Sequence, residues 1–256
     1  MRVVTVPILS DNYSYLVICD ETRRAAVVDP GEADPIRRAL RDEGVELEAI
    51  LCTHHHGDHV AAVEAFSQEG RCRVYGPASE GGRLPALSHP LEDGGEVAVG
   101  RLRGRVMATP GHTLGSAVYL FEGAVFTGDT LFGGGCGRLF EGDAPTLYAS
   151  LQRLAALPPE TELYFGHEYT LKNLQFARGV DPENPDLLAR IVGAEEARAA
   201  GRPTVPSTVA LERATNPFLR CGEGAIVAHL GLDGAEAAGG DPVGVFARLR
   251  ELRNVF

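Results

Sequence analysis

Short apolar stretches alternate with turn-forming residues over the first two thirds of the chain. Stretches of this length, rich in Val, Ala, Leu and Phe, are typical of strands. They predict strands at residues 3–9, 14–18, 25–28, 49–52, 72–75, 95–99, 102–108, 117–121, 124–127 and 163–165. Apolar positions at helical spacing predict helices at 35–43, near 60–68 and at 145–156. Strands mixed with helices favour two packed sheets that are covered by helices.

Helical spacing becomes dominant from about residue 169 onward. It predicts a helix at 186–200 and a last helix that has Asp241 as its N-cap and Pro242 in its first turn. This last helix carries an apolar stripe formed by Val245, Leu249, Leu252 and Phe256. We therefore expect residues 1–168 to form one domain and residues 169–256 to form a smaller helical domain.

Two segments of the second region have weaker patterns. Ser207 is of the residue type that caps helices, and it predicts the start of another short helix. The stretch 222–240 is rich in Gly and Ala, and it gives no firm prediction of an element. The helical character of the region therefore depends on its two longer periodic segments.

The composition supports a substantial core and argues against several classes of partner. Hydrophobic residues make up 44% of the 256 residues, and the net charge is −11. An acidic chain is a poor general ligand for nucleic acid or for an anionic membrane, and no apolar run approaches the length of a membrane span. The five cysteines include no CxxC pair, and the N-terminus lacks a signal-peptide pattern. We expect a monomer in the cytoplasm.

The densest group of chemically useful side chains lies directly after the predicted strand 49–52. Residues 53–59 read THHHGDH. Side chains alternate along an extended chain, so His54 and His56 point one way while His55 points the other way. The pattern assigns His54 and His56 to one shared site, and His55 to a structural or solvent-facing role.

The second half of this segment changes direction. Gly57 permits a sharp turn, after which Asp58 and His59 project along a new line. A lone histidine is more often a structural residue than a ligand, but burying several unpaired histidines together would be costly. Imidazole with carboxylate suits zinc, iron and manganese. The segment therefore predicts two groups of metal ligands.

Three later predicted strands end in one layout, a glycine followed by a candidate ligand. The pairs are Gly111-His112, Gly128-Asp129 and Gly166-His167. The complete set then has seven members: His54, His56, Asp58, His59, His112, Asp129 and His167. A tetrahedral zinc takes about four ligands, so seven suit two ions that share a carboxylate and lie about 3.5–4 Å apart. His89 and His229 lack this layout and are interpreted as surface or turn residues.

The motifs THHHGDH, GHT, TGDT and GHE together resemble those of the metallo-β-lactamase superfamily. Further segments, GCGRLFEG at 135–142, PTVPST at 203–208 and NPFLR at 216–220, are similar to those of the hydroxyacylglutathione hydrolases, or glyoxalase II family. The similarity covers essentially the whole chain. It implies an α+β fold, a four-layer αββα sandwich over 1–168, followed by a helical glutathione- and substrate-binding domain over 169–256.

The resemblance also implies how the seven ligands divide between two divalent metal ions. His54, His56 and His112 would hold the first ion; Asp58, His59 and His167 would hold the second; Asp129 would bridge them. Zinc is the first choice of metal, with iron and manganese as alternatives, because mixed His and Asp ligands accept all three. Asp58 and Asp129 are expected to act catalytically as ligands that orient the hydroxide.

The family reaction is the hydrolysis of S-(2-hydroxyacyl)glutathione thioesters. S-D-lactoylglutathione gives glutathione and D-lactate, which is the second step of methylglyoxal detoxification. A hydroxide shared by two metal ions is the expected nucleophile. The leaving thiolate has a parent pKa of roughly 8.5, so it needs little help from a general acid. The expected partner is therefore a small glutathione thioester.

Glutathione carries carboxylates, so a basic pocket is expected beside the metals. The resemblance assigns the substrate contacts to Arg138, Phe140, Tyr169, Arg250 and Arg253. Without it, Arg250 and Arg253 would be interpreted as a solvated face at the end of the last helix. Some family members carry Lys at the positions of Arg138 and Arg253, and Tyr at that of Phe140, which changes donor geometry and removes one hydroxyl contact here.

Two alternatives remain open at this point. A glutathione-persulfide dioxygenase of the same superfamily would be an oxidoreductase with one iron held by two His and one Asp, but such chains lack the long helical tail. The second alternative is a non-catalytic metal-binding module. An open site with seven candidate ligands is poorly suited to a purely structural metal. Lactonase and ribonuclease activities of the superfamily fit the acidic charge and the glutathione-like pocket less well.

Overall fold

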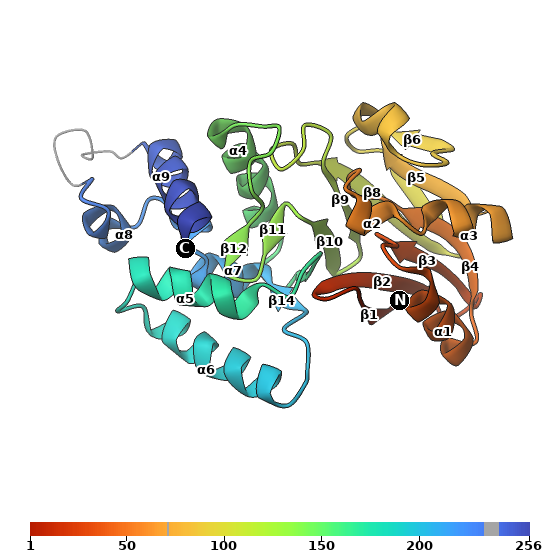
Figure 1. The fold of residues 1–256 in the computed structure, drawn as a ribbon, viewed down its shortest axis with the longest axis horizontal. Helices are drawn as coiled ribbons and strands as arrows, with labels where there is room; N and C mark the ends of the chain where they lie inside the picture. The colour runs from red at the N-terminus through yellow and green to blue at the C-terminus, as the bar shows by residue number, and fades with distance from the viewer. Residues whose placement is uncertain (71, 233–240) are drawn as a thin grey trace.

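Two six-stranded sheets pack face to face in the computed structural model, which describes residues 1–70, 72–232 and 241–256 (Figure 1). The first sheet has the order β1 (Arg2–Ile8), β2 (Asn12–Cys19), β3 (Arg24–Val28), β4 (Glu46–Leu51), β5 (Arg73–Pro77) and β6 (His89–Leu91). The second has the order β14 (Ser207–Thr208), β13 (Glu162–Phe165), β10 (Ala124–Gly128), β9 (Ala117–Phe121), β8 (Leu102–Ala108) and β7 (Glu96–Val99). A separate hairpin joins β11 (Leu131–Phe132) to β12 (Gly135–Cys136).

Helices cover the outer faces of both sheets (Figure 1). Those beside the first sheet are α1 (Ala33–Glu43), α2 (Gly57–Val60), α3 (Val63–Gly70) and the 3-10 helix η1 (Ala78–Arg83). Those on the side of the second sheet are α4 (Ala144–Ala155), α5 (Thr170–Val180), α6 (Pro185–Ala199), α7 (Val209–Thr215), the 3-10 helix η2 (Pro217–Leu219), α8 (Gly224–His229) and α9 (Pro242–Val255). None of the helices in the described part of the chain combines the length and apolar character that a membrane crossing requires.

Alternation along the strands produces three apolar layers. Tyr15 faces the space between the sheets, whereas its neighbour Leu16 faces the outer helices. The layer between the sheets includes Tyr15, Tyr119 and Phe126. The two outer layers include Leu16, Ile36 and Phe66 on one side and Val125, Leu151 and Phe246 on the other. The order helix, sheet, sheet, helix confirms the predicted αββα sandwich with a helical C-terminal region.

Most predicted elements occur, with ends that move by a few residues, and three local predictions need correction. The helix near 60–68 is two helices, because the Ala62 amide donates to Pro30 O at 2.9 Å and not to the preceding helical turn. Ser207 lies in β14, and the side chain of Thr208 caps α7 by accepting from Leu211 N. Helix α5 was not predicted at all.

The last helix begins as its sequence indicates, because the side chain of Asp241 accepts from Val243 N and Pro242 occupies the first turn. The stretch 222–240 carried no firm prediction of an element, and the structure places α8 within it. Residues 233–240 of that stretch lie outside the described residues. Strand β14 pairs with β13, so the C-terminal region extends the second sheet at its edge.

Candidate metal centre and adjoining pocket

All seven predicted ligands converge at one edge of the sandwich, because each follows the end of a strand. The stretch after β4 supplies His54 and His56, and α2 supplies Asp58 and His59. The loops after β8, β10 and β13 supply His112, Asp129 and His167. Gly166 is required here, since a Cβ at this position would lie 2.5 Å from Asp129 Oδ1.

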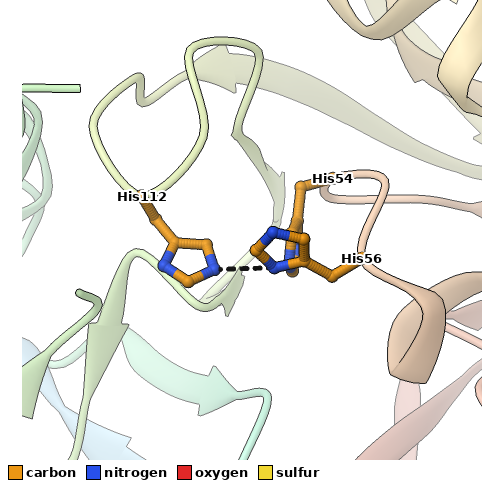
Figure 2. A group of neighbouring side chains, drawn as sticks. All are labelled: His54, His56 and His112. Atoms are coloured by element: carbon orange, nitrogen blue, oxygen red, sulfur yellow. Dashed lines mark hydrogen bonds between the residues drawn. The ribbon is translucent and has the colours of Figure 1, made fainter. Parts of the chain in front are cut away.

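Three histidines form the first group, and their ring nitrogens point toward one another (Figure 2). His56 Nδ1 lies 3.1 Å from His54 Nε2 and 3.0 Å from His112 Nε2. Ligand nitrogens about 2.0–2.1 Å from a tetrahedral ion are separated by about 3.3–3.4 Å. The spacing of this group therefore fits a shared metal ion.

The second group contains Asp58, His59 and His167. Asp58 Oδ2 lies 3.5 Å from His59 Nε2 and 3.4 Å from His167 Nε2, and the two histidine nitrogens lie 3.3 Å apart. Asn12, which the sequence analysis did not select, donates to Asp58 Oδ2 at 2.9 Å. This group also has the spacing of metal ligands.

Asp129 lies between the two groups. Its Oδ2 is 3.5 Å from His112 Nε2 and 3.4 Å from His167 Nε2, and its Oδ1 is 3.3 Å from His59 Nε2. Oδ1 is buried and has no hydrogen-bond partner among the described residues. A buried, unsatisfied carboxylate oxygen is costly unless a cation binds it, so this atom fits a metal site.

Four of the five candidate histidine ligands make a hydrogen bond through the ring nitrogen that faces away from the site. His54 Nδ1 contacts Thr53 Oγ1 at 3.0 Å, and His59 Nδ1 contacts Asp29 Oδ2 at 3.0 Å. His112 Nδ1 contacts Arg138 O at 2.9 Å, and His167 Nδ1 contacts Asp11 Oδ1 at 3.1 Å. Such bonds fix the tautomer and the orientation of metal-binding histidines.

Asp11, Asp29 and Thr53 thus support the candidate ligands, although no sequence motif singled them out. Asp29 also accepts from Thr53 N and Thr53 Oγ1, at 2.8 and 2.7 Å. The available signal for Asp29 was its position directly after a strand, which is the layout shared by the ligands themselves. Nothing comparable distinguishes Asp11 from an ordinary hairpin residue.

Neighbouring charges and burial shift the pKa values of the candidate ligands. Burial alone would raise the pKa of Asp129, but His59 and His167 hold it well below its usual range. Burial would lower the pKa of His167, but its hydrogen bonds with Asp129 and Asp58 raise it to about 10. The hydrogen bond from His167 lowers the pKa of Asp58. Both carboxylates are therefore ionised at neutral pH.

A cavity of about 350 Å³ adjoins the candidate metal centre. His112 and Asp129 form part of its wall, and all five predicted substrate-binding residues line it: Arg138, Phe140, Tyr169, Arg250 and Arg253. Lys172 and Asn173 of α5 and Cys136 of β12 complete the lining, together with Phe132. The five predicted substrate-binding residues therefore lie in one pocket beside the candidate metal ligands.

Two of the three arginines of α9, Arg250 and Arg253, do not form a solvated face. Arg250 is 4% exposed and Arg253 is 9% exposed. Arg250 Nη1 donates to Cys136 O at 2.8 Å, and Arg253 Nη2 donates to Asn173 Oδ1 at 3.0 Å. Burial, with the nearby charges of Arg250 and Arg138, lowers the pKa of Arg253. Within the described residues, neither arginine nor Arg138 forms a salt bridge with a carboxylate, so the pocket suits an anionic ligand.

Aromatic rings define the boundary between the pocket and the metal centre. The ring of Phe140 is 63% exposed and meets His56 and His112 edge-on, with centroid distances of 5.5 and 5.2 Å. Tyr169 stacks on His167 at 4.7 Å with an interplanar angle of 8°. Phe140 is therefore placed to cover one side of a small molecule that reaches the candidate metal centre.

The C-terminal region holds the hairpin β11–β12, which connects Asp129 to Arg138. Asn216 Nδ2 donates to Phe132 O and Gly135 O, at 3.3 and 3.0 Å. The buried carboxylate of Glu212 accepts from Gly134 N at 2.9 Å and forms an ion pair with Arg190. The tail thus fixes a segment that carries both a candidate ligand and a pocket residue.

The remaining histidines occupy different surroundings. His55 points away from the first group and contacts Glu80 Oε2 through Nδ1 at 2.8 Å. His89 is exposed on β6, where it lies beside the ring of Tyr75. His229 ends α8. None of the three belongs to a ligand group among the described residues.

The fold and the grouped ligands together define a metallo-β-lactamase superfamily protein, and residues 9–167 match the family model described as "Metallo-beta-lactamase superfamily". Residues 168–256 match a second model, "Hydroxyacylglutathione hydrolase C-terminus". The chain belongs to the hydroxyacylglutathione hydrolase family within that superfamily, as its sequence motifs predicted.

Relatives in this family match the chain over its full length. A hydroxyacylglutathione hydrolase of Alkalilimnicola ehrlichii is 49% identical over 261 residues, covering 99% of this chain and 98% of the relative. One from Rhodopseudomonas palustris is 48% identical over 248 residues, covering 96% and 95%.

Solved structures agree with the fold. ETHE1 from Myxococcus xanthus matches with a TM-score of 0.68 and 29% identity, covering 100% of this chain and 99% of that chain. TTHA1623 in a di-iron-bound form matches with a TM-score of 0.62 and 28% identity, covering 86% and 100%.

Proposed function

We propose that this protein is a thioester hydrolase that converts S-(2-hydroxyacyl)glutathione into glutathione and the free acid, with S-D-lactoylglutathione as the reference substrate. The observation that carries the proposal is the direct contact between the seven-ligand cluster and a pocket lined by three arginines. Full-length relatives named hydroxyacylglutathione hydrolase support the same conclusion. These relatives support the hydrolase more strongly than the dioxygenase alternative.

The seven side chains would hold two divalent metal ions. His54, His56 and His112 would bind the first, and the second would be bound by Asp58, His59 and His167, with Asp129 as a ligand of both. Bound metal would supply hydroxide at neutral pH, because it lowers the pKa of water to about 7, and would polarise the thioester carbonyl. Zinc is the first candidate, and the di-iron form of TTHA1623 supports iron as the alternative.

The two carboxylates are suited to binding and orienting rather than to proton donation. Histidine contacts lower the pKa of Asp58, and they hold that of Asp129 low against the effect of burial. A carboxylate that remains ionised at neutral pH cannot act as a general acid. The leaving thiolate, with a parent pKa of roughly 8.5, does not require one.

The pocket residues would recognise the glutathione part of the substrate. Arg138, Arg250 and Arg253 supply guanidinium donors for its carboxylates, and they have no carboxylate partner among the described residues. Tyr169 and Phe140 would hold the thioester beside the metals. We assign catalysis to residues 1–168 and most of the substrate binding to residues 169–256.

The decisive experiment is hydrolysis of S-D-lactoylglutathione, followed by the loss of thioester absorbance, on protein whose metals have been counted. We expect turnover with about two ions per chain and loss of turnover on chelation. No turnover with two ions bound would refute the substrate assignment. One iron with oxygen consumption on a glutathione persulfide would indicate the dioxygenase.

A further inference from the structure

His56 differs from the other candidate histidine ligands in how it is held. The other four make a hydrogen bond through Nδ1 on the side away from the site, whereas His56 uses Nδ1 toward His54 and His112 (Figure 2). Its Nε2 has no hydrogen-bond partner among the described residues. The orientation of this ring must therefore depend on what packs around it.

Two rings flank His56 outside the ligand group. His55 lies with its centroid 5.0 Å away, and Phe140 lies 5.5 Å away on an adjoining loop. Both contacts are edge-on, at interplanar angles of 65° and 87°. A ring held between two others keeps its orientation only if those neighbours are themselves fixed.

His55 is fixed by the buried carboxylate of Glu80, which is 1% exposed. Glu80 Oε2 accepts from His55 Nδ1 and from Arg83 Nη2, each at 2.8 Å. Glu80 Oε1 accepts from Thr113 Oγ1 at 2.6 Å, so the same carboxylate also holds the residue next to His112. A Cβ on Gly115 would lie 2.6 Å from Glu80 Cδ, which shows how closely the loop encloses this group.

Glu141 fixes the loop that carries Phe140, as Glu80 fixes His55. Its Oε2 accepts from Leu114 N at 2.8 Å, and its Oε1 pairs with Arg83 Nη1 at 2.5 Å. The same Oε1 lies 3.7 Å from His55 Nε2. Arg83 thus joins the two carboxylates, and the four residues form a closed set, called here the Glu80 network: Glu80, His55, Arg83 and Glu141.

We propose that the Glu80 network is the positioning device of the first metal group, and that Glu80 and His55 orient His56 by packing where the other ligands use a hydrogen bond. The network contacts three of the segments that form the first half of the centre: 54–56, 112–115 and 140–141. It touches neither Asp58 nor His167. The proposal rests on the proposed function only in taking the first group as a metal site.

The test measures stepwise zinc binding by chelator competition, which does not depend on turnover. Glu80→Gln keeps the size of the side chain and removes its charge. We expect it to weaken one binding step by roughly 10–100-fold, as loss of outer contacts does in other metal sites, and to leave the other step unchanged. Cobalt-substituted protein should show a changed visible spectrum in this variant.

Two variants provide matched comparisons. Asp11→Asn removes the negative charge of the carboxylate that contacts His167 Nδ1 and should weaken the other binding step. Glu48→Gln changes a carboxylate that also bonds a backbone amide, Gly100 N at 3.0 Å, and pairs with Arg73 away from the site. It should alter neither binding step nor the cobalt spectrum.

Equal weakening of both steps by Glu80→Gln, or of the same step by Glu80→Gln and Asp11→Asn, would overturn the proposal. If Glu80→Gln does not fold, His55→Ala decides, because that side chain is 20% exposed. Selective weakening supports the proposal, and unchanged affinity refutes it. If the wild-type protein binds only one ion, the two-ion mechanism is refuted but the role of Glu80 is not. The affinity of Glu80→Gln for that single ion then tests the role of Glu80.

Discussion

At the scale of the residue, the site combines ionised carboxylates with histidines whose positions are set by different neighbours. Asp129 is the residue that connects the two ligand groups, since its oxygens lie within 3.5 Å of His59, His112 and His167. Its Oδ1 has no other partner among the described residues. Loss of this side chain should therefore affect both groups together.

Asp129→Ala is expected to lose both metal ions and the hydrolytic activity at the same time. Metal analysis after gel filtration, together with the thioester assay, measures this. Asp34→Ala, which removes an exposed carboxylate paired with Arg37 on α1, serves as the control and should retain both ions. Retention of two ions by Asp129→Ala would show that the carboxylate does not bridge.

Arg250→Ala is expected to raise KM by roughly 10–100-fold with a smaller effect on kcat, because one charged hydrogen bond contributes about 1.5–3 kcal/mol to binding. Steady-state kinetics with S-D-lactoylglutathione measures both constants. Arg248 lies on the same helix and pairs with Glu251 at the surface. Arg248→Ala should therefore leave both KM and kcat unchanged. An unchanged KM in Arg250→Ala would remove this residue from the substrate pocket.

At the scale of the element, strand ends carry the ligands and the C-terminal helices hold the segment between them. The carbonyls of the hairpin β11–β12 accept hydrogen bonds from Asn173, Asn216 and Arg250 of the tail. The carbonyl of Arg138, just beyond the hairpin, bonds His112. Distortion of the hairpin should therefore reach both the pocket and the metal centre.

Asn216→Ala is expected to destabilise the fold by about 2 kcal/mol and to raise KM. The fully buried amide serves Phe132 O and Gly135 O and caps η2 at Phe218 N, so its loss leaves buried groups unpaired. Urea unfolding and steady-state kinetics measure the two effects. A loss of stability with unchanged KM would mean that the hairpin does not transmit the change.

The end of β8, which leads to His112, should be sensitive to acid. A hydrogen bond from Ala108 N, with help from Arg153, lowers the pKa of Asp93 from its ordinary 3.8. A group with a lowered pKa stabilises the fold above its unfolded pKa, and that contribution disappears as the pH falls through the folded value. The difference in unfolding free energy between wild type and Asp93→Asn should thus shrink from about pH 5 to about pH 3, because carboxyl groups titrate in roughly this range. A constant difference would contradict this.

At the scale of the whole molecule, a protein of net charge −11 has a pocket lined by the buried Arg250 and Arg253 and the exposed Arg138, beside a cluster of histidines and carboxylates. The two sheets bring the ligands together from β4, β8, β10 and β13, and the tail closes the pocket. The candidate metal centre therefore takes its residues from both sheets of the sandwich.

Metal removal is expected to lower the midpoint of thermal unfolding. A ligand at about 1,000 times its Kd adds about 4 kcal/mol to the stability of the state that binds it. Thermal unfolding of chelated and metal-restored protein measures the shift. Equal midpoints would indicate that the ions bind the unfolded chain equally well or do not join the two sheets.

The sequence by itself determined the superfamily, the layered fold and the identity of the seven converging side chains. The pattern that identifies the candidate metal ligands is local. A strand that ends in glycine followed by His or Asp can be recognised within a few residues of sequence. The αββα sandwich, the family and its function were predicted from these motifs and from the tail segments, and the comparisons confirm them.

Only the tertiary structure decided which groups support the ligands and which arginines are buried. Glu80 contacts His55 and Thr113 from a separate 3-10 helix, and Asp29 meets His59 across 30 positions of sequence. Arg250 reaches Cys136 across 114 positions, and the same helix spacing would equally suit a solvated face. Contacts of this kind depend on how separate elements pack, and no periodicity along the chain encodes them.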